Sequence, residues 1–159
     1  MGSPVFRRAA GVGGVTPPPS GPARRYLAFD FGTRRVGVAT GNDALRMAQP
    51  LRSVQAEGDA RFAAIAALLA DWQPDALVVG VPYHPDGAAH DNTRRAQRFG
   101  RQLHGRFHLP VHEVDERYTT TEALAAGASD ADAAAAALIL EQFFRSLPLD
   151  NPADAPTRR

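Results

Sequence analysis

Acidic residues stand at three places where a predicted element of secondary structure begins or ends. Asp30 lies inside "YLAFDFGTRRVGVATG", a stretch that otherwise has the pattern of buried strands. Asp115 and Glu116 directly follow a short apolar run, and Asp132 opens an alanine-rich segment. In an open sheet covered by helices, sites gather at the carboxyl ends of strands. We therefore expect these carboxylates, which are far apart in the sequence, to meet in one site.

Such a cluster would favour a bound cation. Carboxylates that are brought together repel one another, and either protonation or a cation relieves the repulsion. The chain has no cysteine, so the ligands would be oxygen atoms, which suit Mg²⁺ or Mn²⁺. Two such ions about 4 Å apart can hold the attacking and leaving oxygens of a phosphodiester. This hypothesis makes Asp30 a metal ligand at the centre of the sheet, with Gly32 leaving room for the substrate.

Each acid also has a purely structural interpretation. Asp30 could cap the turn that follows it, and Asp115 with Glu116 could form a solvated loop. Asp132 fits a capping pattern that begins at Ser129, in which the helix dipole stabilises the carboxylate. The residues alone leave both interpretations open.

Hydrophobic periodicity predicts the elements that would position these acids. Five segments have the pattern of strands, namely 26–31, 36–40, 47–54, 76–82 and 111–114. Three segments have helical spacing, namely 59–72, 91–104 and 132–147, and 119–126 would add a helical turn or two. We expect Pro50 to shorten the third strand and Asp59 to cap the first helix. The apolar side of the last helix is expected to comprise Leu138, Ile139, Phe143 and Phe144.

The order of these elements, β-β-β-α-β-α-β-α, predicts an α/β fold with a mixed sheet and helices on its faces. Residues 24–147 would form one domain, between a disordered tail over 1–23 and a loose tail over 148–159. The absence of cysteine favours a reducing, cytoplasmic location. Neither a run of about 20 apolar residues nor a secretory signal is evident, so no membrane partner is expected.

The charge pattern points to phosphate contacts at one place. The formal net charge is only +1, but all 18 basic residues are arginine, whose planar fork suits phosphate. Arg94, Arg98 and Arg101 recur at helical spacing, with Arg95 beside them. This basic stripe is either a solvated helix face or, as we hypothesise, a surface that contacts nucleic-acid phosphates.

Four segments together resemble the YqgF/RuvX family, a bacterial family with an RNase H-like fold that is related to Holliday-junction resolvases. They are "LAFDFGTRRVGVATG", "ALVVGVPYHPDG", "VDERYTTTEA" and "DADAAAAALILEQFF", in this order. The similarity covers about residues 25–145. It implies an RNase H-like α/β fold in which a mixed five-stranded sheet has helices on both faces.

The resemblance also implies a metal-dependent nuclease that acts on structured nucleic acid, with Mg²⁺ or Mn²⁺ as its cofactor. The first-strand acid of the family falls on Asp30, its DER motif on Asp115, Glu116 and Arg117, and the acid of its last helix on Asp132. The implied metal ligands are Asp30, Glu116 and Asp132, with Asp115 as the substitute for Glu116. Arg117, Thr119 and Thr120 would lie beside them and touch phosphate.

Members of the family are assigned either to processing the 5′ end of pre-16S rRNA or to resolving Holliday junctions. We favour the rRNA, because two symmetric cuts in a junction call for a C2 dimer and we expect a monomer or weak dimer. Many relatives have a longer, often lysine-containing loop where this chain has "AAGASDAD", which bears on junction specificity more than on metal binding. A non-catalytic RNA-binding assembly factor is the second alternative. A phosphotransferase is disfavoured, because its nucleotide cleft needs two such domains.

Overall fold

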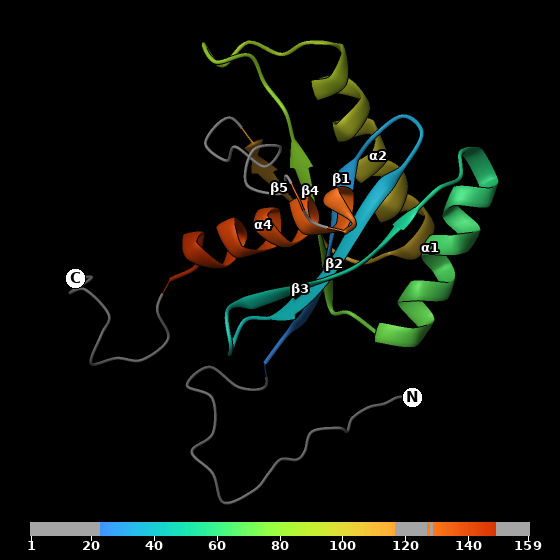
Figure 1. Ribbon diagram of the computed structural model, residues 1–159, viewed down its shortest axis with the longest axis vertical. Coiled ribbons are helices and arrows are strands. Elements are labelled where there is room, and N and C mark those ends of the chain that lie inside the picture. The colour runs from blue at the N-terminus through green and yellow to red at the C-terminus, as the bar shows by residue number, and fades with distance from the viewer. Residues whose placement is uncertain (1–22, 117–126, 128, 149–159) are drawn as a thin grey trace, which may run out of the picture. The chain divides into compact units, whose positions relative to one another are not determined.

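Five strands form one mixed sheet in the order β3-β2-β1-β4-β5 (Figure 1). They are β1 (Arg25–Phe31), β2 (Val36–Asn42), β3 (Met47–Val54), β4 (Ala76–Val81) and β5 (Val111–Asp115). β1 pairs antiparallel with β2, and β2 pairs antiparallel with β3, whereas β1, β4 and β5 run parallel. The predicted meander is therefore present, and β1 is the central strand of the sheet.

The computed structural model describes residues 23–116, 127 and 129–148. Residues Arg24–Ser146 form one compact unit. The tails expected over 1–23 and 148–159 lie outside the described residues apart from Ala23 and Pro148, and the helical turns expected over 119–126 lie outside them entirely. Within the described ranges, no helix combines the length and apolar character that crossing a membrane requires.

Helices lie on both faces of the sheet (Figure 1), and ring contacts show that the side chains of β1 alternate between these two helical layers. On one face, the rings of Phe29 and Phe31 contact Phe99 of α2 (Asp91–Phe107), with centroid distances of 5.8 and 5.2 Å. α1 (Gly58–Trp72) packs into the same core. On the other face, the Tyr26 ring contacts two phenylalanines of α4 (Ala131–Ser146). The predicted α/β fold, with a mixed five-stranded sheet and helices on both faces, is confirmed.

Small side chains bring α4 close to the sheet. Ala39 of β2 packs against Ala136 and Ala137, and the helix also buries Ala133 and Ala135. A helix with alanine at its contact face can approach a sheet more closely than one with leucine there. The alanine-rich sequence is therefore a packing feature of this layer. The predicted apolar side of α4 is confirmed at Ile139, Phe143 and Phe144. Leu138 is only half-buried, and the prediction omitted Leu140, which is fully buried.

Two local predictions fail for identifiable reasons. β3 continues through Pro50, because it is an edge strand and its register with β2 shifts between Val38 and Ala39, a bulge that accommodates proline. Asp59 does not cap α1, which begins one residue earlier, after Glu57, and has no side-chain cap hydrogen bond. Asp59 instead lies in the first turn of the helix.

The first turn of α2 is fastened to the end of β4. The Nδ1 atom of His90 accepts a hydrogen bond from the backbone N–H of Asn92 (3.2 Å), and Thr93 Oγ1 accepts one from the His90 N–H (3.0 Å), which completes a capping box. The fully buried Thr93 hydroxyl also donates to the carbonyl oxygen of Pro82, just beyond β4. This attachment fixes the position of the arginines that α2 carries.

Candidate active site

Asp30 lies near the carboxyl end of the central strand, between two glycines. The register pairs it with Gly37 of β2 and with Gly80 of β4. Residues paired in register project to the same face of a sheet, and Tyr26, four residues before Asp30 on β1, contacts α4. The Asp30 side chain therefore shares the face that α4 covers, and neither neighbouring strand fills the space beside it.

The Glu116 carboxylate occupies the space over Gly80. A Cβ atom added to Gly80 would lie 2.8 Å from Oε2 of Glu116 and 2.5 Å from Cδ1 of Ile139 on α4. Because Gly80 is paired with Asp30, the Glu116 carboxylate lies beside Asp30 on the same face. The fold thus brings together two of the acids that the sequence places 86 positions apart (116 − 30).

Asp132 approaches from the other side, over Gly37. A Cβ atom added to Gly37 would overlap the carbonyl group of Asp132 and lie 2.9 Å from the backbone nitrogen of Ala133. The first turn of α4 therefore rests directly on the strand position that is paired with Asp30. Asp30 itself, the Glu116 carboxylate over Gly80 and the backbone of Asp132 over Gly37 thus mark adjacent positions of three neighbouring strands.

Arg35 engages the carboxylate of Asp132. Its Nε donates to Oδ2 of Asp132 at 2.7 Å, and the Ser53 hydroxyl lies 3.5 Å from the same oxygen. The ion pair is partly exposed, so it contributes little to stability by itself. Sequence reasoning missed Arg35, although its place in the turn directly after β1 was a signal that it lies near Asp30.

Asp130, rather than Ser129 or Asp132, caps α4. Its Oδ1 accepts hydrogen bonds from the backbone N–H of Ala133 (3.0 Å) and from the Ser53 hydroxyl (2.7 Å). Burial by itself would raise the pKa of Asp130, but these hydrogen bonds outweigh it and hold the pKa below its ordinary value. The capping role, which was the structural interpretation of Asp132, thus belongs to Asp130.

Replacing Asp130 with alanine should lower the free energy of unfolding by about 1 kcal/mol, because the first turn of α4 loses its cap. Since the folded pKa of Asp130 is depressed, its carboxylate stabilises the protein above the unfolded pKa of about 4, and this contribution is lost as the pH falls through the folded value. Urea unfolding at neutral and acidic pH measures both effects. Asp130→Asn, which keeps an acceptor oxygen, is the control; equal stability of wild type and Asp130→Ala at neutral pH would contradict the capping role.

Asp115 lies on the opposite face of the sheet from Glu116. The register pairs Asp115 with Val81, which is buried in the core beneath α1 and α2. Its backbone carbonyl accepts a hydrogen bond from the side chain of Gln142 on α4 (3.1 Å), which anchors the end of β5. The register therefore places Glu116, and not Asp115, on the face of Asp30.

We expected Gly32 to leave room for the substrate, but the structure gives this glycine a different reason. A Cβ atom added there would lie 2.5 Å from the carbonyl oxygen of Arg35. The close approach is therefore within the β1–β2 turn. The space around Asp30 comes instead from Gly37 and Gly80.

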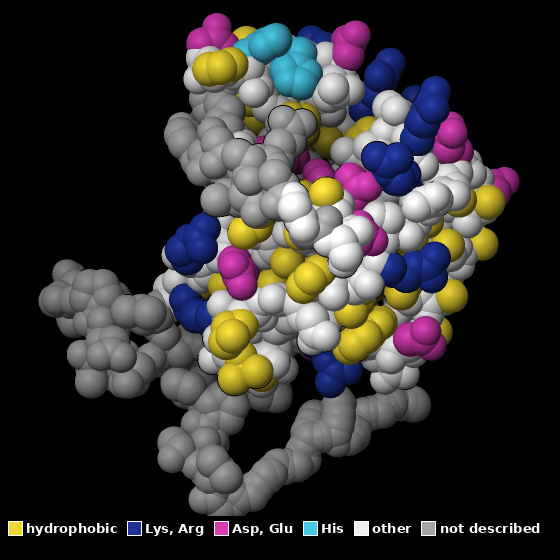
Figure 2. Space-filling view, viewed as in Figure 1, with side chains coloured by type: hydrophobic (Ala, Val, Ile, Leu, Met, Phe, Trp, Pro, Cys, Tyr) yellow, Lys and Arg dark blue, Asp and Glu magenta, His cyan; other side chains and the backbone are white. Residues whose placement is uncertain are grey.

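The donor chemistry of the site fits a hard divalent cation, since its acidic groups offer only oxygen atoms. No three Asp, Glu or His side chains stand close enough to share a cation in the part of the chain that the structure describes. The Asp132 carboxylate is engaged by Arg35 instead. Figure 2 shows acidic side chains near the centre of this face, with arginine side chains beside them.

The predicted phosphate-binding residues divide into two groups. Arg94, Arg98 and Arg101 are exposed on α2, and Arg94 lies 3.5 Å from Asp91 in an exposed ion pair. α2 covers the face of the sheet opposite to Asp30. Arg117, Thr119 and Thr120 lie outside the described residues.

Comparison with known proteins identifies relatives over the whole compact unit. The family model described as RuvX, Holliday junction resolvase, matches residues 24–146. A protein of Albidiferax ferrireducens named "Putative pre-16S rRNA nuclease" is 70% identical over 122 residues, which cover 77% of this chain and 78% of that protein. A protein of the same name from Paraburkholderia phytofirmans is 51% identical over 140 residues, which cover 84% and 96%.

Among solved structures, the Thermus thermophilus RuvC in complex with a Holliday junction substrate is similar with a TM-score of 0.48 and 16% identity. The match covers 76% of this chain and 93% of that one. The family description and the names of the sequence relatives all denote nucleases. On the match to its model and on these identities, the chain belongs to the RuvX family.

Proposed function

We propose that this protein is a metal-dependent endonuclease that hydrolyses phosphodiesters in structured nucleic acid, and that its substrate is the 5′ end of pre-16S rRNA. The observation that carries the proposal is the Glu116 carboxylate over Gly80, beside Asp30, with the first turn of α4 over Gly37. The proposal is supported by the position of Asp30, the Glu116 carboxylate and the backbone of Asp132 at adjacent strand positions near the carboxyl end of the central strand. The names of the relatives support the choice of RNA.

Asp30, Glu116 and Asp132 would hold Mg²⁺ or Mn²⁺, with oxygen ligands of the kind that these ions prefer. When bound, such cations would supply the Lewis acidity for activating water and stabilising the leaving oxygen. The chain itself positions the acids: the sheet holds Asp30, the end of β5 holds Glu116, and Arg35 and Asp130 hold the first turn of α4. Arg35 could also contact a phosphate of the substrate, because it is paired with Asp132, one of the three proposed metal ligands.

Glu116→Gln should reduce cleavage by more than about 100-fold, because it removes a charged metal ligand. Even the loss of a residue that only hydrogen-bonds to a metal ligand lowers metal affinity or activity by about 10–100-fold. Asp115→Asn should reduce cleavage by less than about tenfold, because Asp115 lies on the opposite face of the sheet. Rates with Mn²⁺ on a pre-16S 5′ leader measure both. Equal losses in the two variants would contradict the assignment of Glu116.

The substrate is tested with the same protein on two nucleic acids in parallel, the pre-rRNA leader and a four-way DNA junction, with Mg²⁺, Mn²⁺ or EDTA. We expect the leader to be cut at one position, and no cutting in EDTA. Cutting of the junction alone would replace rRNA processing by junction resolution, the activity in the family description. Tight RNA binding without cutting of either substrate would make the protein a binding factor.

A further inference from the structure

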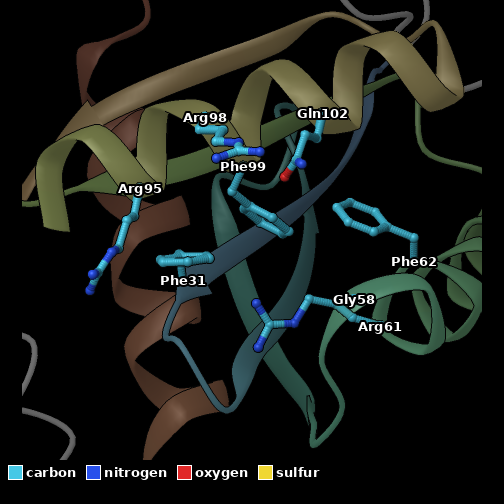
Figure 3. Close-up of a pocket in the computed structure, with 8 residues that line it drawn as sticks. All are labelled: Phe31, Gly58, Arg61, Phe62, Arg95, Arg98, Phe99 and Gln102. Atoms are coloured by element: carbon cyan, nitrogen blue, oxygen red, sulfur yellow. The ribbon is translucent and has the colours of Figure 1, made fainter. Parts of the chain in front are cut away.

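A hollow with a volume of 230 Å³ lies between α1, α2 and the end of β1 (Figure 3). Aromatic rings and guanidinium groups make up most of its wall. The residues that line it include Phe31, Phe62, Phe99, Arg61, Arg95 and Arg98. Because Phe31 belongs to the face of β1 that α2 covers, the hollow lies on the other side of the sheet from Asp30.

Arg61 is a buried cation in this wall, with only 6% of the residue exposed. Its Nε donates to the carbonyl oxygen of Ala56 (2.8 Å) and its Nη2 to that of Thr33 (3.1 Å), so the guanidinium is held in place. Burial lowers the pKa of Arg61, which is the cost of keeping a charge away from water. Within the described residues, no carboxylate lies within ion-pair distance of it.

Arg95 and Arg98 add two further cations from the facing helix (Figure 3). Both are exposed, and among residues 23–116, 127 and 129–148 neither forms an ion pair with a carboxylate. Three positive charges from two helices therefore surround one hollow, and none of them forms an ion pair with a carboxylate of the described residues, although the charge of Glu57 acts on Arg61 from a longer distance. An anion bound there would compensate them, and guanidinium groups match phosphate oxygens in geometry.

Phe31 supplies an aromatic surface at the rim. It is half-buried, its ring centroid is 5.2 Å from that of Phe99, and the guanidinium carbon of Arg61 is 5.6 Å from its centroid. Figure 3 shows its ring between Arg95 and Arg61. A nucleobase can stack on such a ring while its phosphate contacts the arginines.

The hollow and the candidate active site are adjacent along the chain. Asp30 and Phe31 are consecutive residues, about 3.8 Å apart at Cα, and their side chains point to opposite faces of the same strand end. A nucleic-acid strand that crosses the carboxyl edge of the sheet can therefore reach both sites. A nucleotide held at Phe31 would be close to the phosphodiester at Asp30.

We infer that this hollow binds an unpaired nucleotide of the substrate, with its phosphate on Arg61, Arg95 and Arg98 and its base on Phe31. The inference rests on the proposed function, because it takes the substrate to be nucleic acid. It adds a requirement for a single-stranded nucleotide near the cut, and a duplex that is paired throughout cannot meet that requirement.

Binding in EDTA tests the inference without cleavage. Fluorescence anisotropy would compare a labelled single-stranded RNA of about 12 nucleotides with an abasic oligomer of the same backbone. The double variant Arg95→Gln/Arg98→Gln should bind both oligomers about tenfold more weakly. It should also lower the slope of log K against log salt by about 1.4, the value for two phosphate contacts on a single strand.

Phe31→Leu should weaken binding of the RNA about fivefold or more and leave the abasic oligomer unchanged, because leucine preserves apolar volume but cannot stack. Arg145→Gln, which removes one exposed charge from the last turn of α4 on the other face, is the matched control and should change neither affinity by more than about twofold. Thermal unfolding of each variant confirms that it is folded.

The outcomes separate the two hypotheses. If the arginine double variant binds both oligomers as tightly as wild type, while wild type cuts the leader, the hollow is not a nucleotide site and the nuclease assignment is unaffected. If Phe31→Leu weakens both oligomers equally, the base does not stack on Phe31. If wild-type protein neither binds nor cuts nucleic acid, the proposed function fails and the hollow loses its ligand with it.

Discussion

Asp30→Asn should abolish metal-dependent cleavage, with a loss of more than about 100-fold. The substitution keeps the size of the side chain but removes its charge, and a neutral amide is a weak ligand for Mg²⁺ or Mn²⁺. Asp30 is the acid at the centre of the arrangement, since both neighbouring strands present glycine beside it. No other acid of the described chain occupies a strand position paired with both Gly37 and Gly80.

Cleavage rates of purified wild type and Asp30→Asn on the pre-rRNA leader measure this effect, and a second measurement does not depend on activity. A cation that binds only the folded state stabilises it by RT ln(1 + [L]/Kd), about 2.7 kcal/mol at a hundredfold excess over Kd, and thereby raises the melting temperature. Mn²⁺ should therefore raise the melting temperature of wild type but not of Asp30→Asn. Equal activity and an equal Mn²⁺ response of the two proteins would remove Asp30 from the site.

Gly37→Ala should lower the free energy of unfolding by about 3 kcal/mol, at the upper end of the usual cost of overpacking. The added methyl group would overlap the backbone carbonyl of Asp132 and press on the nitrogen of Ala133. Backbone atoms in the first turn of a helix cannot rotate away as the end of a side chain can. The start of α4 must therefore move off the sheet and carry Asp132 with it, so cleavage should fall as well.

Gly105→Ala provides a matched control for the same chemical change. Gly105 lies within α2, and a Cβ atom added there would have no neighbour within 4 Å. Alanine is the better helix former by up to about 1 kcal/mol, so this variant should be slightly more stable than wild type. Urea unfolding of both variants gives the comparison. If Gly37→Ala were as stable as wild type, the close packing of α4 on β2 would be refuted.

The residues around Asp30 illustrate what the sequence could predict. The apolar pattern of 26–31 and the apolar run in 76–82 predicted two strands of the sheet, and the one acid within 26–31 identified Asp30 as a candidate site residue. Acids that follow strands or open helices were expected to converge. The Glu116 carboxylate lies over Gly80 and the backbone of Asp132 lies over Gly37, but among the described residues no three acidic side chains stand close enough to share a cation. Their role as metal ligands stays a prediction.

Other features depended on which residues become neighbours in space. The cap of α4 is Asp130, and its partner Ser53 lies 77 positions away. The ion pair of Arg35 with Asp132 joins residues 97 positions apart, and Arg61 is buried through contacts with two loops. The sequence patterns did not predict a site role for Arg35 or Arg61, because such patterns describe one segment at a time and the contacts of both arginines lie in other segments.

The sequence by itself determined the type and order of the elements and which side chains of one strand share a face, because periodicities of 2 and 3.6 are local properties of the chain. Only the tertiary structure decided the register that sets Gly37 and Gly80 beside Asp30, and with it the choice of Glu116 over Asp115. A strand's own residues do not specify which residue of another strand lies opposite. That choice arises when whole layers pack, through small side chains such as those that bring α4 against β2.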